Sequence, residues 1–211
     1  MKMIIKTLSL IFVVMTISFA QGFSVKTSGE QTFNFEDKKG RNQATFFSTT
    51  PLEDITGISN TVKGKVTFNV SDIKTLKGTI SIPVASLDTG IELRNHHLIS
   101  DNWMDAESYP EITFEIKTVN DVKVEAENKL SAKVTGNFTV HGVTKQVVAD
   151  ATMTYLVESE QTKQRAAGDL LAVQAKFNVI LSDYDIENMI IGQKVAEDIE
   201  ISINMVGSSA M

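Results

Sequence analysis

Cysteine is absent from the 211-residue sequence. Its absence excludes disulfide cross-links and a cysteine nucleophile. A chain of this length can bury a core that is large enough to fold without cross-links. We therefore expect one domain that is stabilised mainly by hydrophobic burial.

Positive charge and catalytic motifs are also scarce. The 20 lysine and arginine residues form no cluster and are outnumbered by 26 acidic residues, so nucleic acid and anionic membrane surfaces are poor partners. The sequence has neither a Gly-x-Ser-x-Gly nor a His-Glu-x-x-His motif. Asp183 and Asp185 fall where a strand is predicted to end, and hydrogen bonding within a turn is their simpler explanation. We expect that the protein is not an enzyme.

Long apolar runs are limited to the N-terminus. Lys2 and Lys6 accompany an apolar segment over residues 8–19, and Ser18-Phe19-Ala20 has the small-x-small pattern of a cleavage site. The run is well short of the ~20 residues of a membrane-spanning helix, so it predicts a signal peptide over residues 1–20. We expect an exported protein, periplasmic or extracellular, without stable membrane insertion. Its mature domain, residues 21–211, has 18 basic and 26 acidic residues.

Apolar and polar residues alternate over most of this domain. Leu130, Val134 and Phe138, for example, alternate with hydrophilic residues such as Lys133 and Asn137. A period of two is typical of strands with one face in a core and one in water, and such strands are usually antiparallel. The pattern predicts strands over residues 62–70, 76–84, 111–117, 130–140, 147–157, 171–181 and 198–205.

Turn residues occupy gaps between the strand patterns, as hairpin connections do. The candidate turns are Lys39-Gly40, Asn120-Asp121, Glu125–Asn128 and His141-Gly142. One stretch has helical character, from Thr89 to about Ala106, because apolar and amide residues recur there at three- and four-residue spacing. Pro110 ends it, because a residue before proline avoids the helical conformation.

Eight to ten strands in one domain must cover their edges, and closure into a barrel removes the edges. We expect an all-β, antiparallel barrel of about eight strands with one short helical segment around residues 89–106. The inward positions combine small residues with phenylalanines. Small residues can either leave a cavity or make room for large neighbours, so the barrel can be hollow or filled.

The stretch from Arg94 to Phe114 differs from the strands around it. It reads RNHHLISDNWMDAESYPEITF and contains the only tryptophan and two of the three histidines. It resembles the motif of the YceI-like family, lipid- or polyisoprenoid-binding secreted proteins, in which Arg-Asp-x-His-Leu precedes Ser-x-x-Trp/Phe-x-Asp-Ala and Tyr-Pro-x-Ile-x-Phe. Residues 136–145, 177–186 and 195–203 resemble three more motifs of this family. Asn95 and Leu181 depart from its pattern, where Asp and Arg are usual.

The resemblance implies a lipocalin-like barrel that encloses an apolar tunnel for a polyisoprenoid, an isoprenoid quinone or a fatty acid derivative. It implies no cofactor other than such a bound lipid, and it allows a homodimer. The inward strand faces would line the tunnel. We expect the lining to include Phe68, Ile80, Ile82, Phe114, Val134, Phe138, Phe177 and Ile201.

Arg94, His97, Asp101 and Trp103 form a candidate polar cluster. The first three share one face if the helix is continuous, because they are spaced at i, i+3 and i+7. In one interpretation they contact a ligand head group through the guanidinium fork. In the simpler one, Arg94 pairs with Asp101 and holds the helix across the barrel end. Trp103 then forms a plug or a wall of the barrel.

Metal binding is not expected, although His96 and His97 are adjacent. Neighbouring helical residues point about 100° apart and do not readily chelate one ion. Two functions then fit the sequence. The first is an exported, non-catalytic carrier of a long apolar molecule, and the second is an envelope stress or scaffold protein with a filled barrel and a protein partner.

Overall fold

The structure is a computed structural model that describes residues 21–210, so the expected signal peptide lies outside the described residues. Ten antiparallel strands form one sheet, accompanied by the helix α1 (Glu92–Ile99) and three short 3-10 turns. The strands are β1 (Glu30–Asn34), β2 (Gln43–Thr49), β3 (Asp54–Ser59), β4 (Lys63–Asn69), β5 (Asp72–Pro83), β6 (Glu111–Ala126), β7 (Lys129–Val140), β8 (Val143–Leu156), β9 (Leu170–Ile180) and β10 (Asp198–Ser208). The short turns are η1 (Val84–Ser86), η2 (Thr162–Gln164) and η3 (Leu181–Tyr184).

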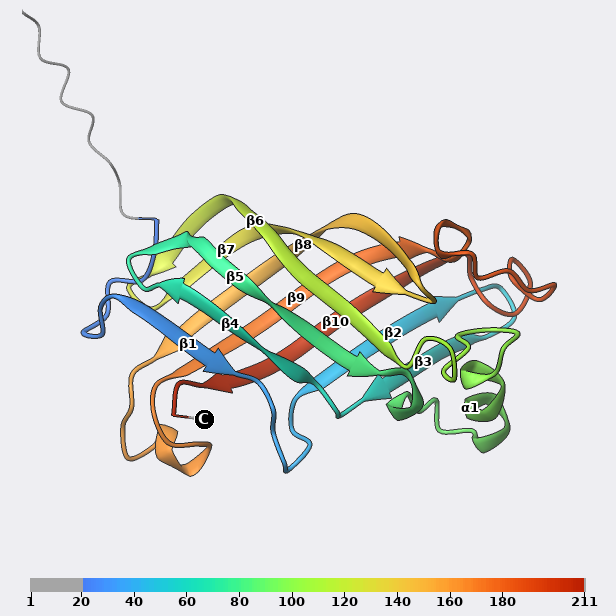
Figure 1. Ribbon diagram of the computed structural model, residues 1–211, viewed down its shortest axis with the longest axis horizontal. Coiled ribbons are helices and arrows are strands. Elements are labelled where there is room, and N and C mark those ends of the chain that lie inside the picture. The colour runs from blue at the N-terminus through green and yellow to red at the C-terminus, as the bar shows by residue number, and fades with distance from the viewer. Residues whose placement is uncertain (1–20, 211) are drawn as a thin grey trace, which may run out of the picture.

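Eight of the strands close into a barrel (Figure 1). The order runs from β1 through β4 to β10, and the circle closes where Asn34 of β1 pairs with Ser208 of β10. β2 and β3 form a hairpin that continues the wall beside residues Glu200–Asn204 of β10. The prediction of an antiparallel barrel of about eight strands is confirmed.

Asn42 bridges the gap between β1 and β2 along the edge of β10. Its amide nitrogen donates to the carbonyl oxygens of Phe35, at 2.7 Å, and Val206, at 3.1 Å. Its Oδ1 accepts from the Val206 N–H at 2.8 Å and from Arg165 Nη2 at 2.8 Å. Because the side chain is buried and bonds both backbone groups of Val206, it takes the place of a strand peptide where the chain leaves the sheet.

A charged network holds the loop that carries Asn42. Asp37 accepts hydrogen bonds from the guanidinium groups of Arg41, at 2.9 Å, and Arg165, at 2.8 Å. Backbone N–H groups of Lys39 and Arg41 donate to the same carboxylate. These hydrogen bonds, above all that from the Arg41 side chain, hold the pKa of Asp37 far below its ordinary value.

β4 and β5 approach closely at Gly64 and Gly78. Their φ angles are 138° and 146°, on the side of the backbone map that other residues rarely occupy. A Cβ on Gly64 would overlap the carbonyl oxygen of Thr79, and one on Gly78 would overlap that of Lys65. Only glycine at these two positions therefore allows the backbones of β4 and β5 to approach so closely within the barrel wall.

Each of the seven predicted strands overlaps an observed strand, whereas the turn predictions have mixed outcomes. His141-Gly142 is a two-residue hairpin between β7 and β8, with φ of 51° and 75° as a type I′ turn needs. The predicted turn at Glu125–Asn128 is confirmed and joins β6 to β7. These hairpins place long neighbouring strands side by side in the wall.

Two turn predictions are wrong as hairpins. Asn120-Asp121 lies inside β6, where the pairing with β7 shifts and Asp121 has a φ of 50°. This arrangement is a β-bulge, which bends a long strand without ending it. Lys39-Gly40 lies in the connection from β1 to β2, but these strands pair with other partners and not with each other.

The helix α1 is shorter than the predicted 89–106 segment. It ends at Ile99, because the Ser100 hydroxyl and N–H both donate to the carbonyl oxygen of His97 and the backbone becomes extended at Ser100. Turns follow over residues 101–108. α1 lies at one end of the barrel, beside the β2–β3 hairpin (Figure 1). Within residues 21–210, no helix has the length and apolar character needed to cross a membrane.

Candidate functional site

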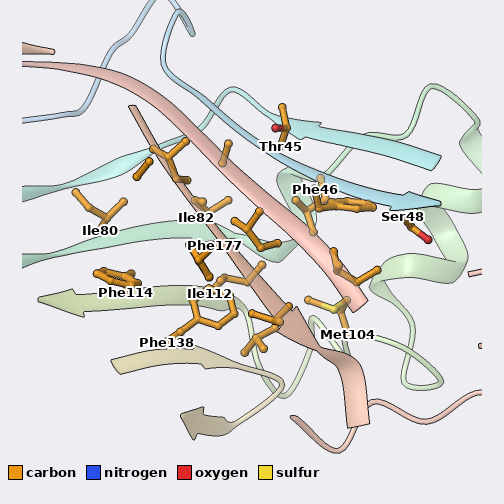
Figure 2. A pocket seen from close by; sticks show the side chains of 18 of the residues that line it. Thr45, Phe46, Ser48, Ile80, Ile82, Met104, Ile112, Phe114, Phe138 and Phe177 are labelled. Atoms are coloured by element: carbon orange, nitrogen blue, oxygen red, sulfur yellow. The ribbon is translucent and has the colours of Figure 1, made fainter. Parts of the chain in front are cut away.

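A cavity of about 440 Å³ occupies the interior of the barrel. This volume lies within the roughly 300–1,000 Å³ of typical ligand pockets. Inward side chains of β2 to β10 line it, and most of them are Ala, Val, Ile, Leu, Met and Phe. Figure 2 shows Ile80, Ile82, Phe114, Phe138 and Phe177 gathered along this wall. The barrel is therefore hollow and its interior is apolar.

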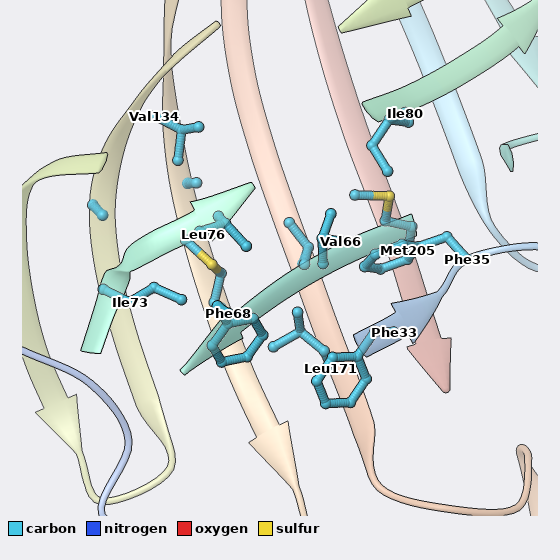
Figure 3. Close-up of a cluster of buried hydrophobic side chains, with 14 of the residues drawn as sticks. Phe33, Phe35, Val66, Phe68, Ile73, Leu76, Ile80, Val134, Leu171 and Met205 are labelled. Atoms are coloured by element: carbon cyan, nitrogen blue, oxygen red, sulfur yellow. The ribbon is translucent and has the colours of Figure 1, made fainter. Parts of the chain in front are cut away.

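Aromatic packing closes one end of the cavity. Phe33 and Phe68 stack with their ring centroids 5.6 Å apart, and Tyr155 meets Phe33 edge-on at 5.5 Å. Phe23 packs against Tyr155 at 5.5 Å, and all four side chains are buried. Figure 3 shows Phe33 and Phe68 beside Leu171, which does line the cavity. We call Phe23, Phe33, Phe68 and Tyr155 the aromatic floor.

Tyr155 also anchors the floor through its hydroxyl group. The hydroxyl donates to Asp169 Oδ2 at 2.7 Å, and the Thr27 hydroxyl donates to the same oxygen at 2.6 Å. Burial and the neighbouring Asp169 carboxylate raise the pKa of Tyr155 well above its ordinary value. Tyr155 thus remains a neutral donor, and the floor presents only ring carbons to the barrel interior.

Phenylalanines from three strands narrow the middle of the cavity. The Phe177 ring lies 5.8 Å from Phe114 and 5.2 Å from Phe138, measured between centroids. Phe138 in turn meets Tyr184 edge-on at 5.6 Å. A Cβ on Gly136 would overlap the Phe114 ring, so the absence of a side chain at Gly136 leaves the space that this ring occupies. Rings in this arrangement present flat apolar surfaces toward the cavity.

The other end of the cavity opens to solvent. A residue can line the cavity and also be exposed only where the cavity reaches the surface. The exposed lining residues fall in two segments. The first is α1 together with the residue before it, and the second is the loop after η3. They are Ile91, Leu93, His97, Ile190 and Lys194. We call this opening the mouth.

Three segments surround the mouth and are joined by hydrogen bonds. Arg94 of α1 donates to Glu53 Oε2, in the β2–β3 turn, at 3.0 Å. The backbone N–H of Ala196 donates to the Ser48 hydroxyl of β2 at 2.8 Å and thereby holds the loop after η3. Figure 2 shows Ser48 near α1, away from the phenylalanines of the middle. The charged residues that line the cavity, Glu53, Arg94 and Lys194, all lie at this end.

The predicted pairing of Arg94 with Asp101 is wrong. α1 ends two residues before Asp101, so the expected i, i+7 relation along one helical face does not exist. Asp101 instead accepts from the side chain of Asn102 at 3.1 Å and is not among the lining residues. Arg94 and Glu53 remain 29% and 39% exposed, so their ion pair contributes about 0–1 kcal/mol to stability.

The other residues of the predicted polar cluster do meet at the mouth. His97 and Trp103 both line the cavity, as does Met104. Trp103 therefore forms part of a wall. Tyr109, six residues further along the chain, does not line the cavity; it packs against His141, with ring centroids 5.1 Å apart, and remains partly exposed on the outside.

Seven of the eight predicted tunnel residues line the cavity. They are Ile80, Ile82, Phe114, Val134, Phe138, Phe177 and Ile201. Phe68 is the exception, because it points inward from β4 at the depth of the aromatic floor, below the last lining residue of that strand, Val66. Alternation of apolar and polar residues predicts which face of a strand points into the barrel. It does not predict how far along the barrel axis each residue lies.

Several lining residues were not predicted individually. Leu76, Val173 and Met205 belong to alternating inward sets, so the signal for them was present in the sequence. Phe46 and Ile55, from the short strands β2 and β3, had no comparable signal. Glu53 and Lys194 lie in loops and reach the mouth only through the fold.

No cluster of three potential metal-ligating His, Cys, Asp or Glu side chains occurs among residues 21–210. His96 has Glu92 as its neighbour, with Nε2 and Oε1 3.8 Å apart on the exposed side of α1. His141 lies in the β7–β8 turn and contacts the carbonyl oxygen of Tyr184 at 3.1 Å. The three histidines thus occupy separate environments.

The sequence of this chain is similar to a known protein family and to several relatives. The YceI-like domain matches residues 16–207. A UPF0312 protein of Pseudomonas fluorescens is 32% identical over 118 residues, which are 55% of this chain and 60% of the relative. A UPF0312 protein of Vibrio parahaemolyticus is 32% identical over 139 residues, 63% of this chain and 71% of the relative. The chain thus aligns with about six tenths of the length of the first relative.

Solved structures share the fold at low sequence identity. BcnA of Burkholderia cenocepacia has a TM-score of 0.62 at 19% identity, covering 79% of this chain and 96% of that chain. A domain from Saccharophagus degradans, described as polyisoprenoid binding, has a TM-score of 0.62 at 14% identity, covering 85% and 99%. At such identities the likeness concerns the barrel and its topology.

Proposed function

Because this chain belongs to the YceI-like family, we propose that it is an exported, non-catalytic carrier of a long apolar molecule. The cargo class is a polyisoprenoid, an isoprenoid quinone or a fatty acid derivative. The observation that carries the proposal is the cavity, which has an apolar wall, a closed floor and charged residues only at its mouth. Each CH₂ group that leaves water for such a wall contributes roughly 0.8 kcal/mol. Export rests on the signal-peptide pattern of residues 1–20.

The distribution of polar groups gives the cargo an orientation. The hydrocarbon chain lies against Leu171 and the phenylalanines of the middle, because no polar partner is needed there. The head group remains at the mouth, where Arg94 and Lys194 can donate hydrogen bonds and Ser48 supplies a hydroxyl. A few polar groups at one end of an apolar cavity are sufficient to orient a ligand.

The hollow interior favours a carrier over a filled scaffold. A scaffold barrel would gain stability from filling the space with side chains, since empty apolar volume costs packing energy. The S. degradans neighbour described as polyisoprenoid binding supports a long apolar cargo.

Two neighbouring residues of β9 provide a test. Ala175 lines the cavity, and Gln174 points outward from the same strand. We expect Ala175→Phe to place a ring across the cavity and obstruct it, and so to reduce by at least ten-fold the lipid recovered with the purified protein. Gln174→Phe adds the same ring on the outside and should retain wild-type lipid content. Organic extraction and native mass spectrometry of the three proteins measure this.

Circular dichroism and thermal melting of both variants control for misfolding. The carrier proposal fails if wild-type protein yields no long-chain molecule by either method. It also fails if folded Ala175→Phe retains as much lipid as the wild type.

A further inference from the structure

Exposed apolar side chains are concentrated around the mouth. Among residues 21–210, ten large hydrophobic side chains are exposed, and five of them lie on the three segments that surround the mouth. Met189 is 91% exposed, Leu52 71% and Leu93 65%. The other five lie outside these three segments, on β2, β6, β8 and β9 or just before β6. We call Leu52, Ile91, Leu93, Met189 and Ile190 the apolar rim.

The apolar rim is continuous with the cavity. Ile91, Leu93 and Ile190 belong both to the exposed set and to the cavity lining. In Figure 1 the β2–β3 turn, α1 and the loop before β10 lie at the same end of the barrel. An apolar chain can therefore pass from a surface in contact with the rim into the cavity without crossing water.

Charged residues alternate with the members of the rim. Glu53 follows Leu52, Glu92 and Arg94 flank Leu93, and Lys194 follows Ile190 within the same loop. These charges are unfavourable for a protein interface, because a second copy would have to bury them. They suit the boundary of a bilayer, where apolar tips enter the acyl region and charged neighbours remain among the head groups. The charges include no excess of positive ones, so a neutral bilayer is the better match.

We propose that the apolar rim docks onto the surface of a zwitterionic lipid bilayer, and that cargo moves between bilayer and cavity at this contact. The proposal deepens the carrier function and rests on it, because a carrier of water-insoluble cargo must collect it from a membrane and return it. The contact is superficial and involves side chains of loops and of one short helix.

Co-sedimentation with vesicles of pure phosphatidylcholine tests the proposal. The double variant Leu52→Ser, Met189→Ser removes the most exposed rim residues, and neither of them lines the cavity. We expect it to bind vesicles at least ten-fold more weakly than the wild type. Val124→Ser, Val148→Ser is the matched control, because both valines are 51% exposed on strands away from the rim. It should bind within two-fold of the wild type.

Two further measurements separate docking from carriage and from electrostatic attraction to anionic lipid. Ala175→Phe should still sediment with vesicles although its cavity is obstructed, so that loss of cargo and loss of docking are distinguishable. Neither added phosphatidylglycerol nor high salt should change wild-type binding more than two-fold, because the attraction is apolar.

Three results would overturn the docking proposal. The first is wild-type protein that does not sediment with phosphatidylcholine vesicles. The second is a rim variant that binds as tightly as the wild type. The third is a wild-type dimer, seen by sedimentation equilibrium, that the rim substitutions dissociate while vesicle binding is absent, which would assign the rim to a second copy of the chain.

Discussion

Among single residues, Asp37 illustrates how one carboxylate fixes a connection. It lies between β1 and β2 and accepts hydrogen bonds from Arg41 and Arg165, which are distant from each other in sequence. Its side chain is only 10% exposed, so water screens these bonds little. The ionised carboxylate is strongly favoured in the folded protein, and its low pKa is therefore a source of stability.

We expect Asp37→Asn to lower the free energy of unfolding by about 2 kcal/mol at pH 7. Because the folded pKa lies below the unfolded one, the contribution is complete above the unfolded pKa of about 4 and is lost as the pH falls toward the folded value. Urea denaturation at pH 7 and pH 3 should give a smaller difference between variant and wild type at pH 3. Asp101→Asn, which removes an exposed carboxylate, is the control. A difference that is equal at both pH values would mean that the charge is not the cause.

Predictions for single residues succeeded where it was enough to know which face of a strand carries the side chain. Ile80, Ile82 and Val134 were expected inside the barrel and line the cavity, because alternation fixes the side of the sheet. The partner of Arg94 was not predictable. Glu53 is 41 positions away, and the Asp101 alternative assumed a helix that Ser100 ends.

At the scale of elements, the transition from β1 to β2 along β10 is the most irregular part of the wall. Both strands use the same edge of β10, and neither covers Val206. The side chain of Asn42 fills that position. Neither the alternation of apolar residues nor turn composition signals such a device, because it replaces backbone pairing with a side chain.

We expect Asn42→Ala to reduce the free energy of unfolding by about 3 kcal/mol, because it leaves backbone groups of the buried Phe35 and the half-buried Val206 without partners. Urea denaturation measures this loss. Hydrogen exchange should in addition become faster at the Val206 amide, which donates to Asn42 in the wild type. Asn60→Ala, at an exposed position between β3 and β4, is the control and should change stability by less than about 0.5 kcal/mol. Unchanged exchange at Val206 would contradict the role given to Asn42.

The elements themselves were predicted unevenly. The seven strands from β4 to β10 follow from their alternation, which is long enough to be clear. β2 contains adjacent phenylalanines, Phe46 and Phe47, that break the alternation, and β1 and β3 are short. Their positions depend on pairing with the distant strands β4 and β10, which a local pattern cannot contain.

At the scale of the whole molecule, the proposed cargo would share one core with the protein. The packed floor and the middle of the barrel meet the cavity directly, so an apolar chain inside it continues the packing of the side chains. Anything that binds the folded state and not the unfolded chain raises stability. The carrier proposal therefore predicts that binding of cargo and folding are linked in this protein.

We expect protein stripped of lipid by organic or detergent extraction to melt several degrees below lipid-loaded protein, because bound cargo at 100 times its Kd contributes about 2.7 kcal/mol. Ala175→Phe should melt at one temperature before and after the same treatment. Differential scanning calorimetry of both proteins measures the effect. Equal melting of stripped and loaded wild type would argue that the cavity and its contents are not coupled to folding.

The aromatic floor determines the order in which molecules can enter and leave the cavity. A cavity closed at one end is a blind tube, so the carrier proposal predicts that cargo enters with its tail first and leaves with its head first through the same opening. Two long chains cannot pass each other there, and a bound chain must withdraw before the next one enters. The carrier proposal thus predicts sequential exchange, in which the rate is set by departure of the bound chain and a competing lipid enters only after the barrel has emptied.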